Sequence, residues 1–534
     1  MNDYDKIHPL KARLPYSTFF TKALTLNRNP LNRQSIKSTF QHLFVPETGP
    51  VWSSVILGLV TLIALFLRVL LITKPIQYDE AYTFIFYASR SLNNILANYS
   101  APNNHIFHTI LVAVAYRLLG ASPWILRLPA LVAGTLTVPA AYIAARRFFS
   151  LHQALAAAAA LAVTPGLIAY SANGRGYTMV TLFALLLANF AGNLVQRQSK
   201  SALAAYAITG ALGFYTIPIF LYPMAGISLW VAVTYLTDSD SWRNRLQRLA
   251  VFLVTCALAG LLTLILYSPV IFFGTGLGSL VSNEIVEAQN WSTFVGNLLP
   301  RITNTGINWM MGIAPVFRSL LLGGFLLSLL FYRKVSNQRL PMQVFLALAI
   351  AVLMLLQRVV PLPRVWLFLE AFYMLFAAAG LIWLADVMLK KIAAARLRDG
   401  ILATTILLIV AGYLVNTIYG LRAATVQGND LPEEFAAAYI QDHIQPEDTL
   451  IALPPVDIQT AYYLTINGIP FDRFYQPDHP TEIQNALVVL RTNSKNNTPQ
   501  KVLDVYGLTP GFNLSAAEIV FEYGPLQIYS IPAR

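Results

Sequence analysis

Two adjacent carboxylates, Asp79 and Glu80, follow the first long apolar run of the chain, in the stretch KPIQYDEAYT. Acids are costly beside hydrocarbon and usually have a function there. One of them could act as a general base that takes a proton from an attacking hydroxyl or amine. The simpler alternative is a solvated helix start, because acids favour the first turn of a helix. Two acids directly after an apolar run are unusual, so we expect chemistry here.

Further polar side chains lie at the ends of apolar runs or in the short turns between them. They come from distant parts of the chain and would share one depth at a membrane boundary. These candidates are Asn103, Asn104, His105, Arg127, Asn173, Arg175, Tyr215, Arg358 and Arg364. Arginine holds phosphate or pyrophosphate bidentately and neutralises a leaving group. An acid facing several arginines would suit the transfer of a sugar from a lipid phosphate.

Several of these residues have a simpler interpretation. Arg127 and Arg364 stand near the start of apolar runs, where a long side chain can snorkel to the interface. Arg175 lies between glycines in the turn SANGRGYT, which favours an anion site. His105 and His108 are three residues apart on one predicted helix. A metal pair would need a third ligand, so packing or hydrogen bonding is favoured.

The composition is that of a polytopic membrane protein. Of 534 residues, 56% are hydrophobic and 12% are charged, against about 25% charged in a soluble domain. The net charge of +12 would suggest nucleic acid in a soluble protein, but the basic residues cluster in short segments between apolar runs. That pattern sets membrane topology. The only cysteine, Cys256, excludes a disulfide framework, and the sequence shows no Cys/His cluster for a metal.

Eleven runs are long enough to be membrane spans, since a spanning helix needs about 20 apolar residues. They are 52–73, 124–145, 151–171, 177–195, 201–217, 219–236, 249–273, 315–332, 341–357, 364–385 and 400–420. The basic segments between them fall on the side of the N-terminal tail, which is therefore predicted to be cytoplasmic. Residues 84–98 and 105–120 are predicted as interfacial helices in a long first external loop, and residues 274–314 as another external loop.

Three domains follow from this pattern: a cytoplasmic tail (1–50), a transmembrane domain (51–421) and an extracytoplasmic domain (422–534). The last segment has turn signals and a soluble alternation of elements, which predicts a small α/β domain. The helices are expected near 432–443, 456–465 and 498–507, and the strands near 449–453, 486–490, 516–522 and 525–531. The stretch EYGPLQIYSI resembles a closing hairpin.

The motifs resemble those of glycosyltransferase family 39 and related lipid-phosphate-sugar transferases of the GT-C superfamily, which include protein O-mannosyltransferases and the aminoarabinose transferases of lipid A. YDEAYT resembles the Asp-Glu motif of the first external loop. NNHIFHTILVAVAYRLLG, SPWILRLPALVAGTLTVPAAYIAARRFF, YSANGRGYTMVTLFALLL and PRVWLFLEAFYMLFAA resemble later motifs, in the same order. The resemblance covers about residues 50–385.

This resemblance implies a GT-C fold, a polyprenyl-phosphate-sugar donor and an inverting transfer, with Asp79 as base and Glu80 positioning the acceptor or the base. The residues predicted to bind the donor phosphate or substrate are Asn104, His105, Arg127, Arg175, Tyr177, Tyr215, Arg358 and Arg364. Two features depart from the family: Tyr215 and Thr216 stand where many members have a lysine or histidine, and no MIR-like insert is present.

The expected function is a glycosyltransferase in the bacterial inner membrane, with its site on the periplasmic or extracellular face. Its acceptor would be a lipid, a glycan or a protein, and no nucleic acid partner is expected. The sequence names no metal ligands and no certain cofactor, and it leaves a divalent metal open. One alternative is a transporter or flippase of a lipid-linked substrate, which should show broken or charged spans at mid-membrane and an internal repeat. Another is a scaffold that binds through the external domain.

Overall fold

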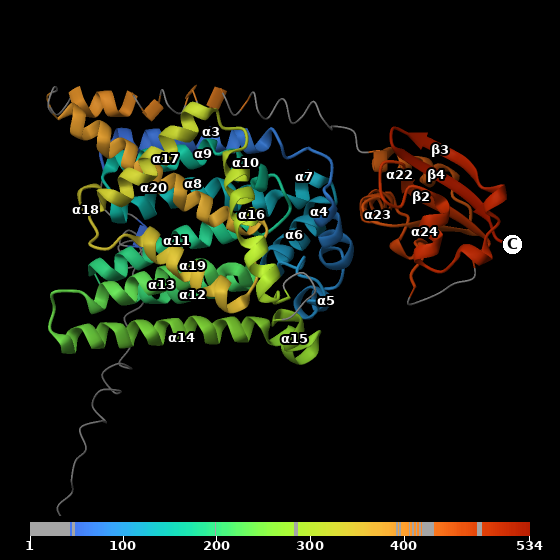
Figure 1. Ribbon diagram of the computed structural model, residues 1–534, viewed down its shortest axis with the longest axis horizontal. Coiled ribbons are helices and arrows are strands. Elements are labelled where there is room, and N and C mark those ends of the chain that lie inside the picture. Colours follow the sequence, from blue (N-terminus) through green and yellow to red (C-terminus); the bar gives the residue numbers. More distant parts are fainter. Residues whose placement is uncertain are drawn as a thin grey trace, which may run out of the picture. The chain divides into compact units, whose positions relative to one another are not determined.

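The computed structural model describes residues 43–44, 49–197, 199–281, 287–390, 394, 432–477 and 483–534, and scattered positions between 397 and 418. The chain divides into two compact units, Met1–Val45 and Pro46–Arg534. Every element discussed below belongs to the second unit (Figure 1).

Helices occupy ten of the eleven predicted spans, and the eleventh, 400–420, lies largely outside the described residues. The long helices are α3 (Val51–Val69), α8 (Leu128–Phe148), α9 (Leu151–Val163), α11 (Tyr177–Arg197), α12 (Lys200–Thr216), α13 (Leu221–Leu236), α14 (Trp242–Phe273), α17 (Pro315–Leu330), α19 (Met342–Gln357) and α20 (Leu367–Leu389). Six described helices are long and apolar enough to cross a membrane, or up to eight if each of two bent pairs is one span. The multi-pass architecture is therefore confirmed, and the count of eleven spans stays a prediction.

The predicted span 151–171 is a broken helix. It bends by 59° between α9 and α10 (Pro165–Ser171). Pro165 has no N–H to give to the carbonyl of Leu161. The buried Arg68 guanidinium of α3 donates to that carbonyl at 3.4 Å and to the carbonyl of Ala162 at 3.1 Å. A cation from the first helix thus satisfies the carbonyls that the break exposes.

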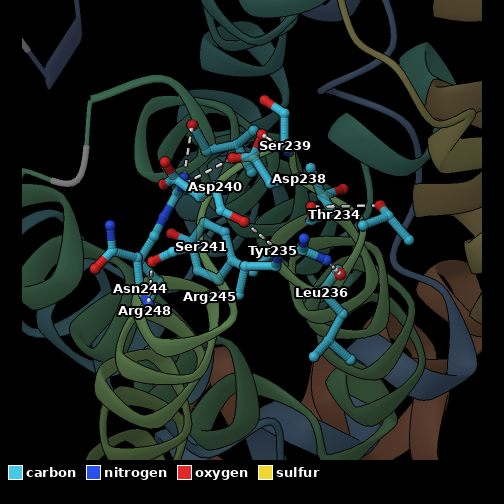
Figure 2. Close-up of polar contacts among 12 residues, drawn as sticks. Thr234, Tyr235, Leu236, Asp238, Ser239, Asp240, Ser241, Asn244, Arg245 and Arg248 are labelled. Atoms are coloured by element: carbon cyan, nitrogen blue, oxygen red, sulfur yellow. Dashed lines mark hydrogen bonds and ion pairs between the residues drawn. The ribbon is translucent and has the colours of Figure 1, made fainter.

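Ion pairs fix the turn between α13 and α14. Figure 2 shows the Arg248 guanidinium directed at the carboxylates of Asp238 and Asp240, at 2.7 and 3.1 Å. The same guanidinium lies 4.5 Å from the centre of the Tyr235 ring. The hydroxyl of Ser241 accepts from the backbone N–H of Asn244 and begins α14. These contacts hold two long helices together on the side predicted to be cytoplasmic.

The segment predicted to be the first external loop is helical, as expected. Its elements are α4 (Tyr78–Thr83), the π-helix η1 (Phe84–Ala88), α5 (Leu92–Ala97), α6 (Ile106–Leu119) and α7 (Pro123–Leu126). The predicted helix 84–98 is divided, because Ser91 caps a new helix through the backbone N–H of Asn94.

The segment predicted as the external loop 274–314 is largely helical where the structure describes it. This segment forms α15 (Gly276–Val281) and α16 (Trp291–Met310), and α16 meets α17 at a bend of 115°. Helix α16 mixes polar residues with a stripe of exposed apolar side chains, among them Val295, Leu299 and Ile302. Its spacing is that of an amphipathic helix, which a search for continuous apolar runs does not detect.

The C-terminal α/β elements are confirmed. They are α22 (Pro432–His443), β1 (Asp448–Ala452), α23 (Asp457–Ile466), β2 (Asn485–Arg491), α24 (Pro499–Val505), β3 (Glu518–Tyr523) and β4 (Leu526–Pro532). The sheet has the order β1-β2-β4-β3, with β1 parallel to β2 and the other pairs antiparallel. Figure 1 labels β2, β4 and β3 in this order. Alternate strand residues pack against α22 and α23 on one face and α24 on the other. The predicted hairpin is β3–β4, and it turns at Gly524, whose φ is +57°.

Candidate active site

Asp79 lies on α4 and pairs with Arg364 of the 3-10 helix η3 (Pro363–Trp366). The Arg364 Nη1 is 2.9 Å from the Asp79 Oδ2, although the two residues are 285 positions apart. Both side chains are accessible, with 30% of the Asp79 side chain and 34% of the Arg364 side chain exposed. The structure therefore brings together a predicted base and a predicted phosphate ligand at a place that a substrate can reach.

Glu80, the next residue, has a different environment. Its carboxylate forms a buried ion pair with Arg127, with contacts of 2.8 and 2.6 Å. The Oε2 also accepts from the backbone N–H of Gln77, and the Oε1 from that of Gly174. Each oxygen has two donors and the side chain is 1% exposed. The two acids predicted to work together therefore differ in environment: Asp79 is accessible and Glu80 is buried.

Arg127 lies just before α8, and its remaining donors are used within the protein. They contact the backbone carbonyls of Ile72, Lys74 and Pro75 at 2.9, 2.5 and 2.8 Å. The guanidinium is fully buried. Arg127 was predicted to bind the donor phosphate or to snorkel. The structure shows neither arrangement: the side chain fixes the segment that leads into α4.

The turn between α10 and α11 approaches the acids closely. Asn173 donates to the Gln77 side-chain oxygen at 2.7 Å. A Cβ at Gly174 would lie 3.3 Å from the Glu80 Oε1, and one at Gly176 would lie 2.8 Å from Thr216. The glycines of SANGRGYT therefore allow the backbone to approach the acid-bearing loop.

Arg175 projects from this turn toward the main chain of Asp79. Its Nη1 donates to the backbone carbonyl of Asp79 at 3.2 Å, and its Nη2 to the side-chain oxygen of Asn103 at 3.4 Å. The residue is 3% exposed, and its Nε has no partner among the described residues. None of the ion pairs formed by the described residues includes Arg175. A buried guanidinium without a carboxylate thus lies against the main chain of Asp79.

His105 accepts from the backbone N–H of Gly176 through its Nδ1, at 2.9 Å. Its Nε2 lies 3.2 Å from the Arg175 Nη2. Burial and then the charge of Arg175 hold the pKa of His105 well below its ordinary value of 6.5. The same two causes lower the pKa of the buried His108 to about 3. Both imidazoles are therefore neutral, and the described residues contain no group of three His, Cys, Asp or Glu side chains that could hold a metal.

The other predicted ligands lie in different surroundings. Asn104 is buried and donates to the carbonyls of Ile95 and Asn98, which folds the first loop back on itself. Tyr177 packs edge to face on His105, with 5.2 Å between the ring centres. Both residues therefore support the site from within the protein.

Tyr215 and Arg358 have no described contact with the acid pair. Tyr215 packs edge to face on Tyr267, with ring centres 5.4 Å apart, in a buried cluster. Arg358 ends α19 in the left-handed conformation, and its guanidinium lies 5.9 Å from the centre of the Trp291 ring. These two predicted phosphate ligands are not brought to Asp79.

The C-terminal domain holds the acid-bearing loop from its other side. Gln459 of α23 donates to the carbonyl of Ile76 at 2.8 Å, and the hydroxyl of Tyr463 accepts from the N–H of Ile76 at 3.4 Å. Tyr462 packs edge to face on Phe84 with ring centres 5.4 Å apart. One apolar cluster spans both parts of the chain. The main chain that leads into Asp79 is therefore fixed by Arg127, Glu80 and α23 together.

A deep apolar groove of about 640 Å³ lies between α16, α19 and α20. Its lining includes Leu298, Trp309, Leu346, Trp366 and Phe372, and its one described charged residue is Arg301. Trp366 belongs to η3, which also carries Arg364. The groove and the Asp79–Arg364 pair therefore meet at η3. The groove was not expected from the sequence, because it depends on the unpredicted helix α16.

Residues 103–273 match the family model described as dolichyl-phosphate-mannose-protein mannosyltransferase. The search of curated proteins found no match. Among solved structures, the apo form of ArnT from Cupriavidus metallidurans matches with a TM-score of 0.58 and 17% sequence identity, covering 89% of this chain and 97% of that one. ArnT from the same organism bound to undecaprenyl phosphate matches with a TM-score of 0.53 and 17% identity, covering 90% and 98%.

These matches confirm the predicted fold class and the predicted family resemblance. The family match runs from residue 103, just before α6, to the end of α14, and the structural match extends over most of the chain. The chain is therefore a multi-pass membrane protein with the GT-C fold of ArnT, and its residues 103–273 carry the sequence pattern of the dolichyl-phosphate-mannose-protein mannosyltransferase family.

Proposed function

We propose that this protein transfers a sugar from a polyprenyl-phosphate donor to an acceptor on the outer face of a bacterial inner membrane, with Asp79 as the general base. The observation that carries the proposal is the accessible Asp79–Arg364 pair beside the 640 Å³ groove. The groove has the apolar lining that a polyprenyl tail requires. The ArnT structure with undecaprenyl phosphate shows that a protein of this fold binds such a lipid.

The reaction is a single displacement. The Asp79 carboxylate takes the proton of the acceptor hydroxyl or amine as that group attacks the anomeric carbon of the sugar. The bond between this carbon and the phosphate oxygen breaks, and its electron pair stays on the lipid phosphate. Arg364 donates to the phosphate and offsets the charge that develops on it. Attack from the face opposite the leaving group inverts the anomeric centre.

The remaining residues hold this arrangement. Glu80 and Arg127 have no free donor or acceptor for a substrate, so we assign them to fixing the main chain at 72–80. Arg175 fixes the backbone carbonyl of Asp79 from the turn between α10 and α11. Preorganisation of this kind lowers the cost of orienting the base.

The test can be run while the identity of the sugar is still open. The purified protein in nanodiscs would be given polyprenyl-phosphate sugars and acceptor lipids and glycans extracted from bacterial membranes. Mass spectrometry would follow the loss of each lipid-linked sugar and the appearance of free polyprenyl phosphate. We expect consumption by the parent protein and at least a hundredfold slower consumption by Asp79→Asn.

Asp472→Asn is the matched control, because Asp472 is an exposed acid of the C-terminal domain. It should consume the donor at the parental rate. Normal turnover by Asp79→Asn would overturn the assignment of the base. Movement of lipid-linked sugar across a vesicle membrane without its consumption would overturn the transferase proposal in favour of a flippase.

A further inference from the structure

A second cavity, of about 290 Å³, lies beside the groove. Its walls come from the segment after α3, from α10, from the end of α16 and from the start of α20. Five of its lining residues determine its chemistry: Lys74, Gly166, Tyr170, Trp309 and Glu370. None of these was singled out from the sequence, and the proposed mechanism uses none of them.

Glu370 is an acid in the first turn of α20, a helix long and apolar enough to span the membrane. Its side chain is buried, with the residue 2% exposed, and its Oε1 has no hydrogen-bond partner among the described residues. Gly166 leaves room for the carboxylate, because a Cβ there would lie 2.5 Å from the Oε2. A buried polar atom without a partner is costly and needs an explanation. A ligand donor in the cavity supplies one.

The cavity also contains donors without partners. The indole Nε1 of Trp309 is buried and unpaired among the described residues. The Lys74 ammonium forms no ion pair with any described residue, and burial and the charge of Arg127 lower the pKa of Lys74. An acceptor at Glu370 and donors at Trp309 and Lys74 thus line one small space with the ring of Tyr170. Aromatic faces with a few polar groups suit a polar ring such as a sugar.

The position of the cavity connects it with the rest of the site. Trp309 lines both the cavity and the apolar groove. Pro363 lines the cavity, and the next residue is Arg364, which pairs with Asp79. A lipid-linked molecule whose tail lies in the groove could therefore place its polar end in the cavity, next to the element that carries Arg364.

We infer that this cavity receives the sugar ring of the lipid-linked donor and that Glu370 accepts a hydrogen bond from a hydroxyl or amino group of that ring. The inference rests on the proposed function and adds a selection step to it. Sugars without a donor at the position facing Glu370 leave the buried carboxylate unpaired, and such a site rejects them strongly. A cationic amino sugar would favour the ionised form of this carboxylate and gain the attraction of its charge.

The experiment compares the consumption of each lipid-linked sugar by the parent protein, Glu370→Gln and Glu370→Leu in the nanodisc assay. Glu370→Leu should slow consumption at least tenfold. Glu370→Gln keeps the volume and an acceptor oxygen but removes the charge. It should therefore slow the consumption of a lipid-linked amino sugar at least tenfold and that of a neutral sugar by a smaller factor. The affinity for undecaprenyl phosphate, which has no sugar, should stay within twofold of the parent value in both variants.

The undecaprenyl phosphate titration also reports whether each variant is folded. Unchanged rates and an unchanged range of consumed sugars in Glu370→Leu would overturn the inference. Loss of undecaprenyl phosphate affinity in Glu370→Gln, parallel to the loss of turnover, would also overturn it, because the carboxylate would then support the fold or the phosphate site. If the parent consumes donor and Asp79→Asn does not, the proposed function stands whichever result Glu370 gives.

Discussion

The side-chain amide of Gln459 donates to the backbone carbonyl of Ile76 at 2.8 Å, and this contact joins the C-terminal domain to the segment that carries Asp79. The hydroxyl of Tyr463 accepts a hydrogen bond from the backbone N–H of Ile76. The backbone N–H and carbonyl of Ile76, three residues before the proposed base, are therefore both satisfied by α23. The C-terminal domain thus supports the segment that carries Asp79.

Removing these two contacts should lower turnover without weakening donor binding. In Gln459→Leu/Tyr463→Phe the main chain of Ile76 loses its partners and Asp79 its fixed position, so we expect kcat to fall by about tenfold. The affinity for undecaprenyl phosphate should not change. Tyr506→Phe is the control, because its hydroxyl donates to Ala452 within the C-terminal domain. Parental kcat in the double variant would show that α23 has no positioning role.

The Glu80–Arg127 pair should behave as a structural ion pair. Glu80→Met leaves the Arg127 charge buried and unpaired, which typically costs about 3–5 kcal/mol. The double variant Glu80→Met/Arg127→Met removes both charges, so it should recover part of this loss. Thermal stability measured by size-exclusion chromatography after heating would compare them. Equal stability of Glu80→Met and the parent would contradict the structural assignment.

Arg364 should contribute to binding of the lipid phosphate. Arg364→Gln removes the accessible cation beside the groove, and we expect a loss of about tenfold in affinity for undecaprenyl phosphate, the size of one charged hydrogen bond. The loss should shrink at high salt, because the pair is partly exposed. Arg339→Gln is the control. Arg339 is more exposed than Arg364 and lies in one of the basic segments predicted to be cytoplasmic. An equal affinity in both variants would place the phosphate elsewhere.

Asp457 should make stability depend on pH. Burial raises the pKa of Asp457 from 3.8 to about 6, although hydrogen bonds from the backbone and Tyr78 act against this rise. The folded protein therefore holds this proton more tightly than the unfolded chain, and its contribution to stability falls as the pH rises from about 4 through 6. Asp457→Asn should raise the midpoint of thermal unfolding at pH 8 by a few degrees. The difference should be much smaller at pH 4.5, and Asp472→Asn should show no such dependence.

The sequence was sufficient to predict the features that repeat along the chain. Continuous apolar runs located ten helices, and turn signals with an alternation of helical and strand segments located the C-terminal α/β domain. It was insufficient for α16, whose polar face breaks the apolar run. It also could not show that Asp79 and Glu80 have opposite environments, because that depends on Arg127 and Gly174, which are 47 and 94 residues from Glu80.

Two functional candidates were missed although a signal was present. Glu370 interrupts the apolar stretch WLFLEAFYML, and an acid inside a span is a reason to expect a site. Lys74 stands directly after the first span, where snorkelling is its ordinary interpretation. The cavity that joins them comes from four segments, so no local pattern relates the two residues.

The contact between Gln459 and Ile76 spans 383 positions of the chain, and this separation has a consequence for the time at which the protein becomes competent. A ribosome that has passed Ile76 must still complete the helices up to α22 and enter the last fifth of the message before Gln459, the partner of Ile76, exists. Until then the nascent polypeptide carries Asp79 on a segment that lacks the support of α23.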